Sequence, residues 1–192
     1  MEEIETVIEG PFGWIGADSV FISRIAARKG VYLFTAQTPK GHLVYYVGET
    51  GATFIERLAQ HLQSYVIGQY HIYEAQSFSG GVKNLVFEGW MNKKPRRQAR
   101  AEYLNAIEEY GPKMLEFIGC MKILLLPAEQ ETRTIERMEA GISLHLKRKP
   151  VPVGTFQDEG ILYRPRKKSE EPLALRIGRF ENILGLNECV EI

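Results

Sequence analysis

Apolar and β-branched residues gather in two short runs in the first third of the chain. These runs, residues 30–35 and 42–48, have the composition of half-buried strands and are joined by a Thr-Pro-Lys-Gly turn at 38–41. A third run, 121–126, is almost continuously apolar and stops at Pro127, which is typical of a strand buried on both faces. The pattern therefore predicts a β-hairpin with a third strand paired to it.

A helical pattern follows the hairpin. Thr53 and Glu56 have the spacing of a capping box, so we expect the helix to begin at Phe54. Arg57 and His61 are four residues apart, which stacks them on one edge of this helix, facing the end of the hairpin. The predicted apolar stripe beside them consists of Phe54, Ile55, Leu58 and Leu62.

A second helical pattern begins in a basic segment. We expect this helix to end at Gly111 and Pro112, since Ala99, Tyr103, Ala106, Ile107 and Tyr110 recur at helical spacing before them. Cations at a helix N-terminus oppose the macrodipole by roughly a few tenths of a kcal/mol each. A nucleic-acid backbone would compensate them, and a solvated charge run is the equal alternative. The basic residues are Lys93, Lys94, Arg96, Arg97 and Arg100.

A third helical pattern covers residues 129–146 and contains an acid in its apolar stripe. The stripe consists of Ile135, Met138, Ile142 and Leu146, and Glu139 falls within it. Burying a carboxylate costs on the order of several kcal/mol unless a cation or donors compensate it. Either a hard divalent ion or a buried salt bridge, for instance to Arg57, satisfies this requirement. Glu136 and Arg137 are predicted to be ordinary surface charges.

Less regular patterns occupy the rest of the chain. Residues 19–23 predict a short strand, and 84–90 fit either a strand or a buried helical turn. A second hairpin is predicted from 151–156 and 161–163. The tail at 172–192 carries enough apolar residues to dock on the body of the protein or on a second copy, which would make a homodimer.

Composition narrows the class of protein. A chain of 192 residues with 44% hydrophobic residues suits one domain with some additions. Its 24 basic and 24 acidic residues cancel, so any nucleic-acid surface must be local. The two cysteines have no metal or disulfide spacing, and neither a leader pattern nor a membrane-length apolar run occurs. These features predict a cytoplasmic protein without membrane contact.

The identity and order of five residues in these elements resemble the motifs of the GIY-YIG nuclease family. Tyr32 stands in Gly-Val-Tyr, Tyr46 stands in Tyr-Val-Gly, and Arg57 and His61 follow. Glu139 opens a stretch that ends in a basic run and a proline at 150, which is similar to the metal-binding helix of that family. The match covers about 30–61 and 121–150.

The resemblance implies an α/β fold with a small three-stranded antiparallel sheet flanked by helices. The nuclease domain would span 30–150, with an insertion at about 63–119 and extensions at 1–29 and 151–192. It also implies metal-dependent cleavage of phosphodiester bonds, with double-stranded DNA as the partner and one Mg²⁺ or Mn²⁺ as the cofactor.

Each site residue has a role that the resemblance implies. Tyr32 would accept the proton of the attacking water or orient that water, and Tyr46 would position water or phosphate. Arg57 would pair with phosphate oxygens, Glu139 would hold the metal, and His61 would relay a proton or bind phosphate. DNA contacts would come from Lys93, Lys94, Arg96, Arg97, Arg100, Lys147, Arg148 and Lys149.

Two other functions stay open on the sequence. A nucleic-acid-binding module could keep this fold without turnover. A protein-interaction domain could use the aromatic residues of 63–119 and the apolar tail. The three hypotheses predict different results with DNA. A nuclease cleaves it, a binding module binds it without cleavage, and a protein-interaction domain does neither.

Overall fold

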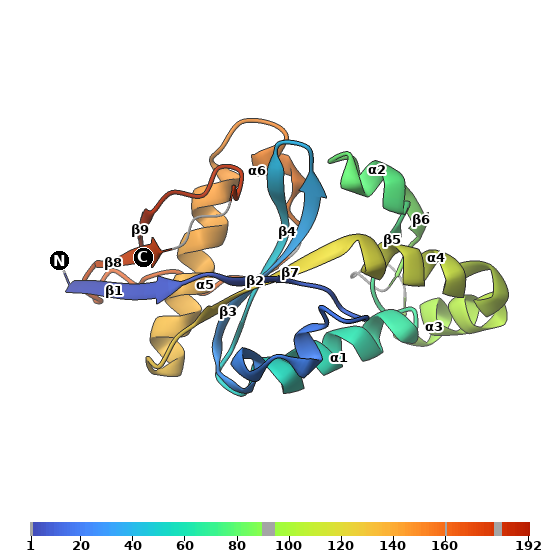
Figure 1. The fold of residues 1–192 in the computed structure, drawn as a ribbon, viewed down its shortest axis with the longest axis horizontal. Helices are drawn as coiled ribbons and strands as arrows, with labels where there is room; N and C mark the ends of the chain where they lie inside the picture. The colour runs from blue at the N-terminus through green and yellow to red at the C-terminus, as the bar shows by residue number, and fades with distance from the viewer. Residues whose placement is uncertain (1, 90–94, 160, 179–181) are drawn as a thin grey trace.

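The computed structural model describes residues 2–89, 95–159, 161–178 and 182–192 (Figure 1). The predicted α/β class is confirmed, because helices pack against both faces of an antiparallel sheet. The sheet has the strand order β2-β7-β3-β4. Its strands are β2 (Glu9–Phe12), β3 (Gly30–Thr38), β4 (Gly41–Thr50) and β7 (Met121–Pro127).

The predicted hairpin and third strand are confirmed. β3 and β4 form the hairpin, and β7 pairs antiparallel with the other side of β3. The predicted number of three strands was wrong, because β2 adds a fourth at the edge beside β7. The sequence of β2 contains Gly10 and Pro11, which resemble a break, but proline is tolerated on an edge strand.

The hairpin contains a β-bulge at Tyr45. Phe34 pairs with Tyr46 and Thr35 with Val44, so Tyr45 is the extra residue of β4. An extra residue reverses the alternation of side chains at that point. Tyr45 and Tyr46 consequently both pack on the cluster that contains Phe34, while Val44 packs on the opposite cluster.

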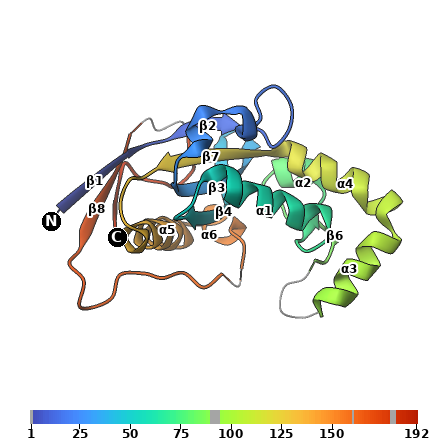
Figure 2. The same ribbon diagram turned by 90° about the horizontal axis from the view of Figure 1, so that it is seen from below.

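Helices cover the two faces of the sheet separately (Figures 1 and 2). Helix α1 (Phe54–Val66) packs on the aromatic face, which includes Tyr32 and Phe34. Helix α5 (Thr132–Lys147) packs on the aliphatic face through Ile135, Met138, Ile142 and Leu146, each 0% exposed. The predicted apolar stripe of this helix is confirmed.

The capping box at the start of α1 is also confirmed. The Thr53 hydroxyl accepts from the Glu56 backbone N–H at 3.2 Å, and Glu56 accepts from the Thr53 backbone N–H at 3.1 Å. The predicted stripe was wrong in part, because Ile55 is 37% exposed and His61 is 3% exposed. The buried positions of α1 are Phe54, Leu58, His61 and Tyr65, which follow the period of 3.6 residues more closely.

Removing the cap should destabilise the protein measurably. We expect Thr53→Ala to lower the free energy of unfolding by about 1 kcal/mol, because the Glu56 backbone N–H loses its acceptor. Urea unfolding followed by circular dichroism measures this change. Thr155→Ala is the control, since that exposed hydroxyl only donates to the Pro152 carbonyl. Equal stability of the two variants would contradict the assigned cap.

The segment between the hairpin and β7 folds into short elements and two helices. They are β5 (Ile72–Tyr73), α2 (Ala75–Ser79), β6 (Leu85–Phe87), α3 (Arg96–Asn105) and α4 (Ile107–Cys120). β5 and β6 pair with each other, so residues 85–87 form a strand and not a helical turn. The expected helix stop at Gly111 and Pro112 was wrong. The break lies at Ala106, and α4 continues through Pro112 because Met114, Phe117 and Ile118 are buried in the core.

The two ends of the chain meet in a second sheet with the order β1-β8-β9. These strands are β1 (Glu2–Val7), β8 (Leu173–Gly178) and β9 (Cys189–Glu191), and β1 runs parallel to β8. This sheet joins the cluster that buries α5, which confirms that the apolar tail docks on the body of the protein. Docking on a second copy stays a prediction.

Two local predictions near the ends were wrong. Residues 19–23 contain the 3-10 helix η1 (Val20–Ile22), followed by η2 (Arg24–Ala27), because the Ser19 hydroxyl caps η1 by accepting from the Phe21 backbone N–H. The expected hairpin after Pro150 is absent among the described residues, which form the short helix α6 (Val153–Phe156) there. Phe156 is buried against the aromatic core, and this contact outweighs the strand-like composition.

Glu136 and Arg137 are not the surface charges that the sequence predicts. Glu136 is 9% exposed and Arg137 is 7% exposed, because the chain after residue 161 folds over this part of α5. Arg133 and Arg164 both donate to the Glu136 carboxylate. Arg137 donates to the backbone carbonyls of Glu171 and Ile192. No helix in the described ranges is long and apolar enough to cross a membrane, and the cytoplasmic location stays a prediction.

Candidate active site

The hydroxyl of Tyr32 is the centre of the candidate site. Tyr32 is 0% exposed, and its hydroxyl lies 2.7 Å from His61 Nε2. Arg57 Nε donates to the same hydroxyl at 3.2 Å. Helix α1 begins directly after β4, so its first two turns carry Arg57 and His61 over the aromatic face of the hairpin. The structure therefore brings together three of the predicted site residues.

Gly48 makes room for this arrangement. Gly48 pairs with Tyr32 in the hairpin. A Cβ atom on Gly48 would lie 2.5 Å from the Tyr32 hydroxyl and 2.5 Å from the Tyr46 ring. Two aromatic rings therefore pack directly against the backbone of β4. This packing is a physical reason for a glycine two residues after Tyr46.

Tyr46 joins the same aromatic group and lies nearer to solvent. Its ring centroid is 6.0 Å from that of Tyr32 and 5.4 Å from that of His61. Tyr46 is half-buried, whereas Tyr32 is fully buried. Burial raises the pKa of both hydroxyls, and the nearby charge of Glu139 raises both further. Both tyrosines are neutral phenols in the free protein.

Glu139 acts on both tyrosines through its charge, which raises the pKa of each. It stands on α5, which packs on the opposite face of the sheet, and the Glu49 backbone N–H helps to lower its pKa. Burial, and then the charge of Glu49, raise the pKa of Glu139 to about 7, although the charge of Arg57 acts in the opposite direction. A salt bridge to Arg57, one of the alternatives for compensating Glu139, is not formed in the described part of the chain. The half-buried acid is thus only partly compensated.

Glu49 and Glu136 surround Glu139 with further negative charge. The pKa of Glu49 is raised by burial and by the charge of Glu136, and its Oε2 is buried with no hydrogen-bond partner among the described residues. Glu136 differs from both, because Arg133 and Arg164 compensate it. Among the described residues, neither Glu139 nor Glu49 forms an ion pair, although the charge of Arg57 acts on both.

These two carboxylates fit a hard divalent ion. No group of three or more His, Cys, Asp or Glu side chains within the described ranges is arranged to hold a metal. Mg²⁺ does not require such a group, because it binds through one or two carboxylates and keeps several waters. The unpartnered Glu49 oxygen and the raised pKa of Glu139 are the features that a bound cation would relieve.

His61 should remain uncharged over the physiological pH range. Burial, and then the charge of Arg57, lower its pKa to about 3 from the ordinary 6.5. Because the folded pKa is depressed, we expect His61 to oppose folding as the pH falls from 6.5 towards 3. NMR titration of the imidazole resonances should show a neutral His61 at pH 5. Resonances that titrate near pH 6.5, assigned by comparison with His61→Gln, would contradict this expectation.

The predicted DNA-binding residues do not form one patch. Arg96, Arg97 and Arg100 are exposed on α3, while Lys93 and Lys94 lie outside the described residues. Lys147 and Arg148 are exposed at the end of α5, with Lys149 half-buried beside them. Helices α3 and α5 lie towards opposite ends of the molecule (Figures 1 and 2).

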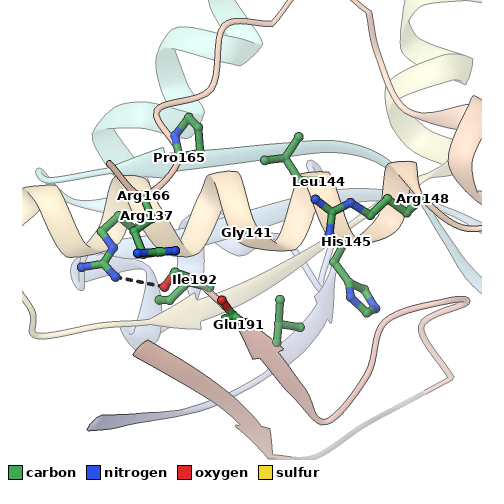
Figure 3. Close-up of a pocket in the computed structure, with 10 residues that line it drawn as sticks. Arg137, Gly141, Leu144, His145, Arg148, Pro165, Arg166, Glu191 and Ile192 are labelled. Carbon is green, nitrogen blue, oxygen red and sulfur yellow. Dashed lines mark hydrogen bonds between the residues drawn. The ribbon is translucent and has the colours of Figure 1, made fainter. Parts of the chain in front are cut away.

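Arg148 borders a hollow of about 260 Å³ between α5 and β9. Arg137 and Arg166 lie near one end of this hollow, and Arg148 and His145 lie near the other (Figure 3). Arg137 and Glu139 are two residues apart on the helix, which turns their side chains about 200° away from each other. The hollow is therefore on the other side of α5 from the candidate active site.

Comparison with known proteins identified no relative of this chain. No family model matches the chain, and no curated protein or solved structure matches it.

Several residues at the site were missed by the sequence patterns. Glu49 follows Gly48 directly, but its meeting with Glu139 depends on how α5 crosses the edge of β4. Tyr70 packs its ring 5.6 Å from the ring of His61, yet it lies in an irregular segment. Glu136 stands three residues before Glu139, and this spacing on one side of a helix was an available signal.

Proposed function

We propose that this protein is a metal-dependent endonuclease of the GIY-YIG type that hydrolyses phosphodiester bonds of DNA. One observation carries the proposal. The Tyr32 hydroxyl is in contact with Arg57 and His61, and Glu139 reaches the same strand edge closely enough to raise the pKa of Tyr32. A phosphate group needs this combination of a proton acceptor, a guanidinium and a metal-binding acid in order to be attacked by water.

The hydrogen bonds support one direction of proton transfer within the proposed mechanism. Arg57 can only donate, so its Nε–H occupies one lone pair of the Tyr32 oxygen. Tyr32 then donates its own proton to His61 Nε2, and the neutral His61 ring carries its proton on Nδ1. Because Tyr32 is fully buried, we assign the positioning of the attacking water to the half-buried Tyr46. The proton of that water would pass through Tyr46 to the Tyr32–His61 pair and from this pair to the leaving oxygen, so that His61 does not keep a charge.

Arg57, Glu139 and Glu49 are assigned to the charge that develops on the phosphate oxygens and on the leaving oxygen. One terminal nitrogen of Arg57 donates to Gln60 Oε1 at 3.1 Å. We assign this half-buried guanidinium to the non-bridging phosphate oxygens, which a planar fork pairs with well. Glu139, with Glu49 beside it, would hold one Mg²⁺ or Mn²⁺, which supplies Lewis-acid stabilisation of the leaving oxygen when it is bound.

Supercoiled plasmid with Mg²⁺ or Mn²⁺ tests this proposal. We expect the wild-type chain to nick the plasmid and EDTA to prevent nicking. Tyr32→Phe should reduce the rate by about 10²–10⁴-fold, because it removes the proton-transfer hydroxyl. Tyr103→Phe is a matched control, since Tyr103 is 0% exposed and its buried hydroxyl has no hydrogen-bond partner in the part of the chain that the structure describes.

Two results would contradict the proposal. Equal nicking by Tyr32→Phe and Tyr103→Phe would remove Tyr32 from the chemistry. Salt-sensitive DNA binding without nicking under every metal condition would instead support a binding module that lacks turnover.

A further inference from the structure

A cavity of about 170 Å³ lies beside the candidate active site and shares Tyr46 and His61 with it. Most of its wall is aromatic. Tyr65 comes from the last turns of α1, and Tyr70 comes from the segment that follows this helix. The rings of Tyr65 and Tyr70 meet edge to face at 5.0 Å, which fixes one side of the cavity.

The β-bulge of the hairpin shapes the opposite side. Tyr45 and Tyr46 both face the cavity because the extra residue turns two successive side chains to one face. The Tyr45 carbonyl accepts a hydrogen bond of 2.7 Å from the Asp158 backbone N–H. This bond fixes the segment after α6 to the bulge and brings the Asp158 side chain to the cavity wall.

The polar groups of the cavity wall can form hydrogen bonds with the edge of a planar ring. His71 Nδ1 accepts from the Gly89 backbone N–H at 3.1 Å, so the neutral His71 ring has its proton on Nε2. Asp158 supplies acceptor oxygens, of which Oδ1 also accepts from the Glu159 backbone N–H at 3.0 Å. His61 is 3% exposed, and its Nδ1 is buried without a hydrogen-bond partner in the described part of the chain.

The occupant of this cavity must be small, planar and uncharged or cationic. Pockets for drug-sized ligands measure roughly 300–1,000 Å³, so a cavity of about 170 Å³ has room for one heterocyclic ring system. No Lys or Arg is among its lining residues, and the Asp158 carboxylate repels phosphate. Aromatic walls favour a group with a π-face.

We propose that this cavity receives one nucleobase, turned out of the DNA helix next to the phosphodiester bond that is cut. The proposal rests on the proposed function, which assigns the phosphate to Arg57 at the adjacent Tyr46 and His61 positions. Enzymes that extrude a base stack it between aromatic side chains and hydrogen-bond its edge. The Asp158 carboxylate accepts from an exocyclic amino group, so the cavity should prefer cytosine to thymine.

Binding of three small probes tests this inference without requiring cleavage. Protein resonances are followed by NMR during titration with deoxycytidine 5′-monophosphate, deoxycytidine and 2-deoxyribose 5-phosphate. We expect the monophosphate to bind at least tenfold more tightly than the sugar phosphate, with the largest shifts at Tyr70 and His71. Equal affinities for these two probes would overturn the inference.

Two variants separate the cavity from the phosphate position. Asp158→Asn keeps the shape of the side chain, and Tyr70→Leu replaces a half-buried ring by an aliphatic group. Each should reduce the affinity for deoxycytidine at least about fivefold and leave the affinity for 2-deoxyribose 5-phosphate unchanged. Unchanged binding of deoxycytidine in both variants would overturn the inference. If deoxycytidine binds and the sugar phosphate does not, the phosphodiesterase proposal fails while the base cavity stands.

Discussion

Replacing Glu139 with glutamine is expected to reduce metal-dependent DNA cleavage by at least about a hundredfold, the size of effect seen when one group that stabilises transition-state charge is removed. Glutamine keeps the shape of the side chain, but it is a poor ligand for a divalent ion. Plasmid nicking with Mg²⁺ measures the loss. Glu129→Gln is the control, because Glu129 is a carboxylate near the start of the same helix, with a side chain that is 72% exposed.

The same variant should change stability in a pH-dependent way. Below pH 4.5 the Glu139 carboxyl is protonated in both the folded and the unfolded chain, so the variant and the wild type differ little. Between pH 4.5 and about 7 the unfolded chain loses this proton while the folded chain retains it, which disfavours the folded state. Glu139→Gln removes this penalty. We therefore expect the variant to gain stability relative to wild type between pH 5 and pH 8.

A bound metal ion should reverse this difference. Mg²⁺ binds the folded site and not the unfolded chain, so it should raise the melting temperature of wild type at pH 8 and leave that of Glu139→Gln unchanged. Thermal unfolding with and without MgCl₂ measures both effects. Equal responses of the two proteins to Mg²⁺ would show that Glu139 does not hold the ion.

A methyl group added at Gly48 should disrupt the aromatic centre of the site. The Cβ atom of Gly48→Ala would lie 2.5 Å from the Tyr32 hydroxyl and from the Tyr46 ring, and both rings are packed among other aromatic side chains. Overpacking of a core typically costs about 1–3 kcal/mol. We expect a loss of stability in this range in urea unfolding and loss of most of the cleavage activity, because both tyrosines must shift.

Gly119→Ala is the matched control for this substitution. Gly119 lies near the end of α4, and among the described residues beyond its chain neighbours and its own helix backbone no heavy atom lies within 4 Å of the position that its Cβ would take. Alanine is favoured over glycine in a helix by about 1 kcal/mol, so this variant should be as stable as wild type or more stable. A Gly48→Ala protein with wild-type stability and activity would show that the two rings do not depend on close contact with β4.

Local patterns in the sequence predicted the parts of the site that depend on neighbouring residues. The hairpin, the capping box of Thr53 and the apolar stripe around Glu139 each follow from a short window of sequence. Gly48 and Tyr32 are opposite each other because the hairpin pairing fixes their register. These features placed Tyr32, Arg57 and His61 together.

Features that depend on distant segments were not predictable in this way. Glu136 and Arg137 became buried because Arg164 and Ile192 reach them from later parts of the chain. The bulge at Tyr45 depends on the pairing partners of β4. The order of polar and apolar residues along this strand does not indicate it. The parallel pairing of β1 with β8 joins the two ends of the protein, which no local pattern indicates.

Cleavage of a duplex DNA library with a randomised central region is the most direct test of the proposed activity. The library contains every short recognition sequence, so the absence of a particular target cannot explain a negative result. The fragments are sequenced after incubation with Mg²⁺ or Mn²⁺, for the wild type and for Glu139→Gln. We expect metal-dependent breaks with wild type that are missing with the variant. Libraries left equally intact, or equally cut, by the two proteins would contradict the account of Glu139 and Tyr32 as a metal-dependent phosphodiesterase site.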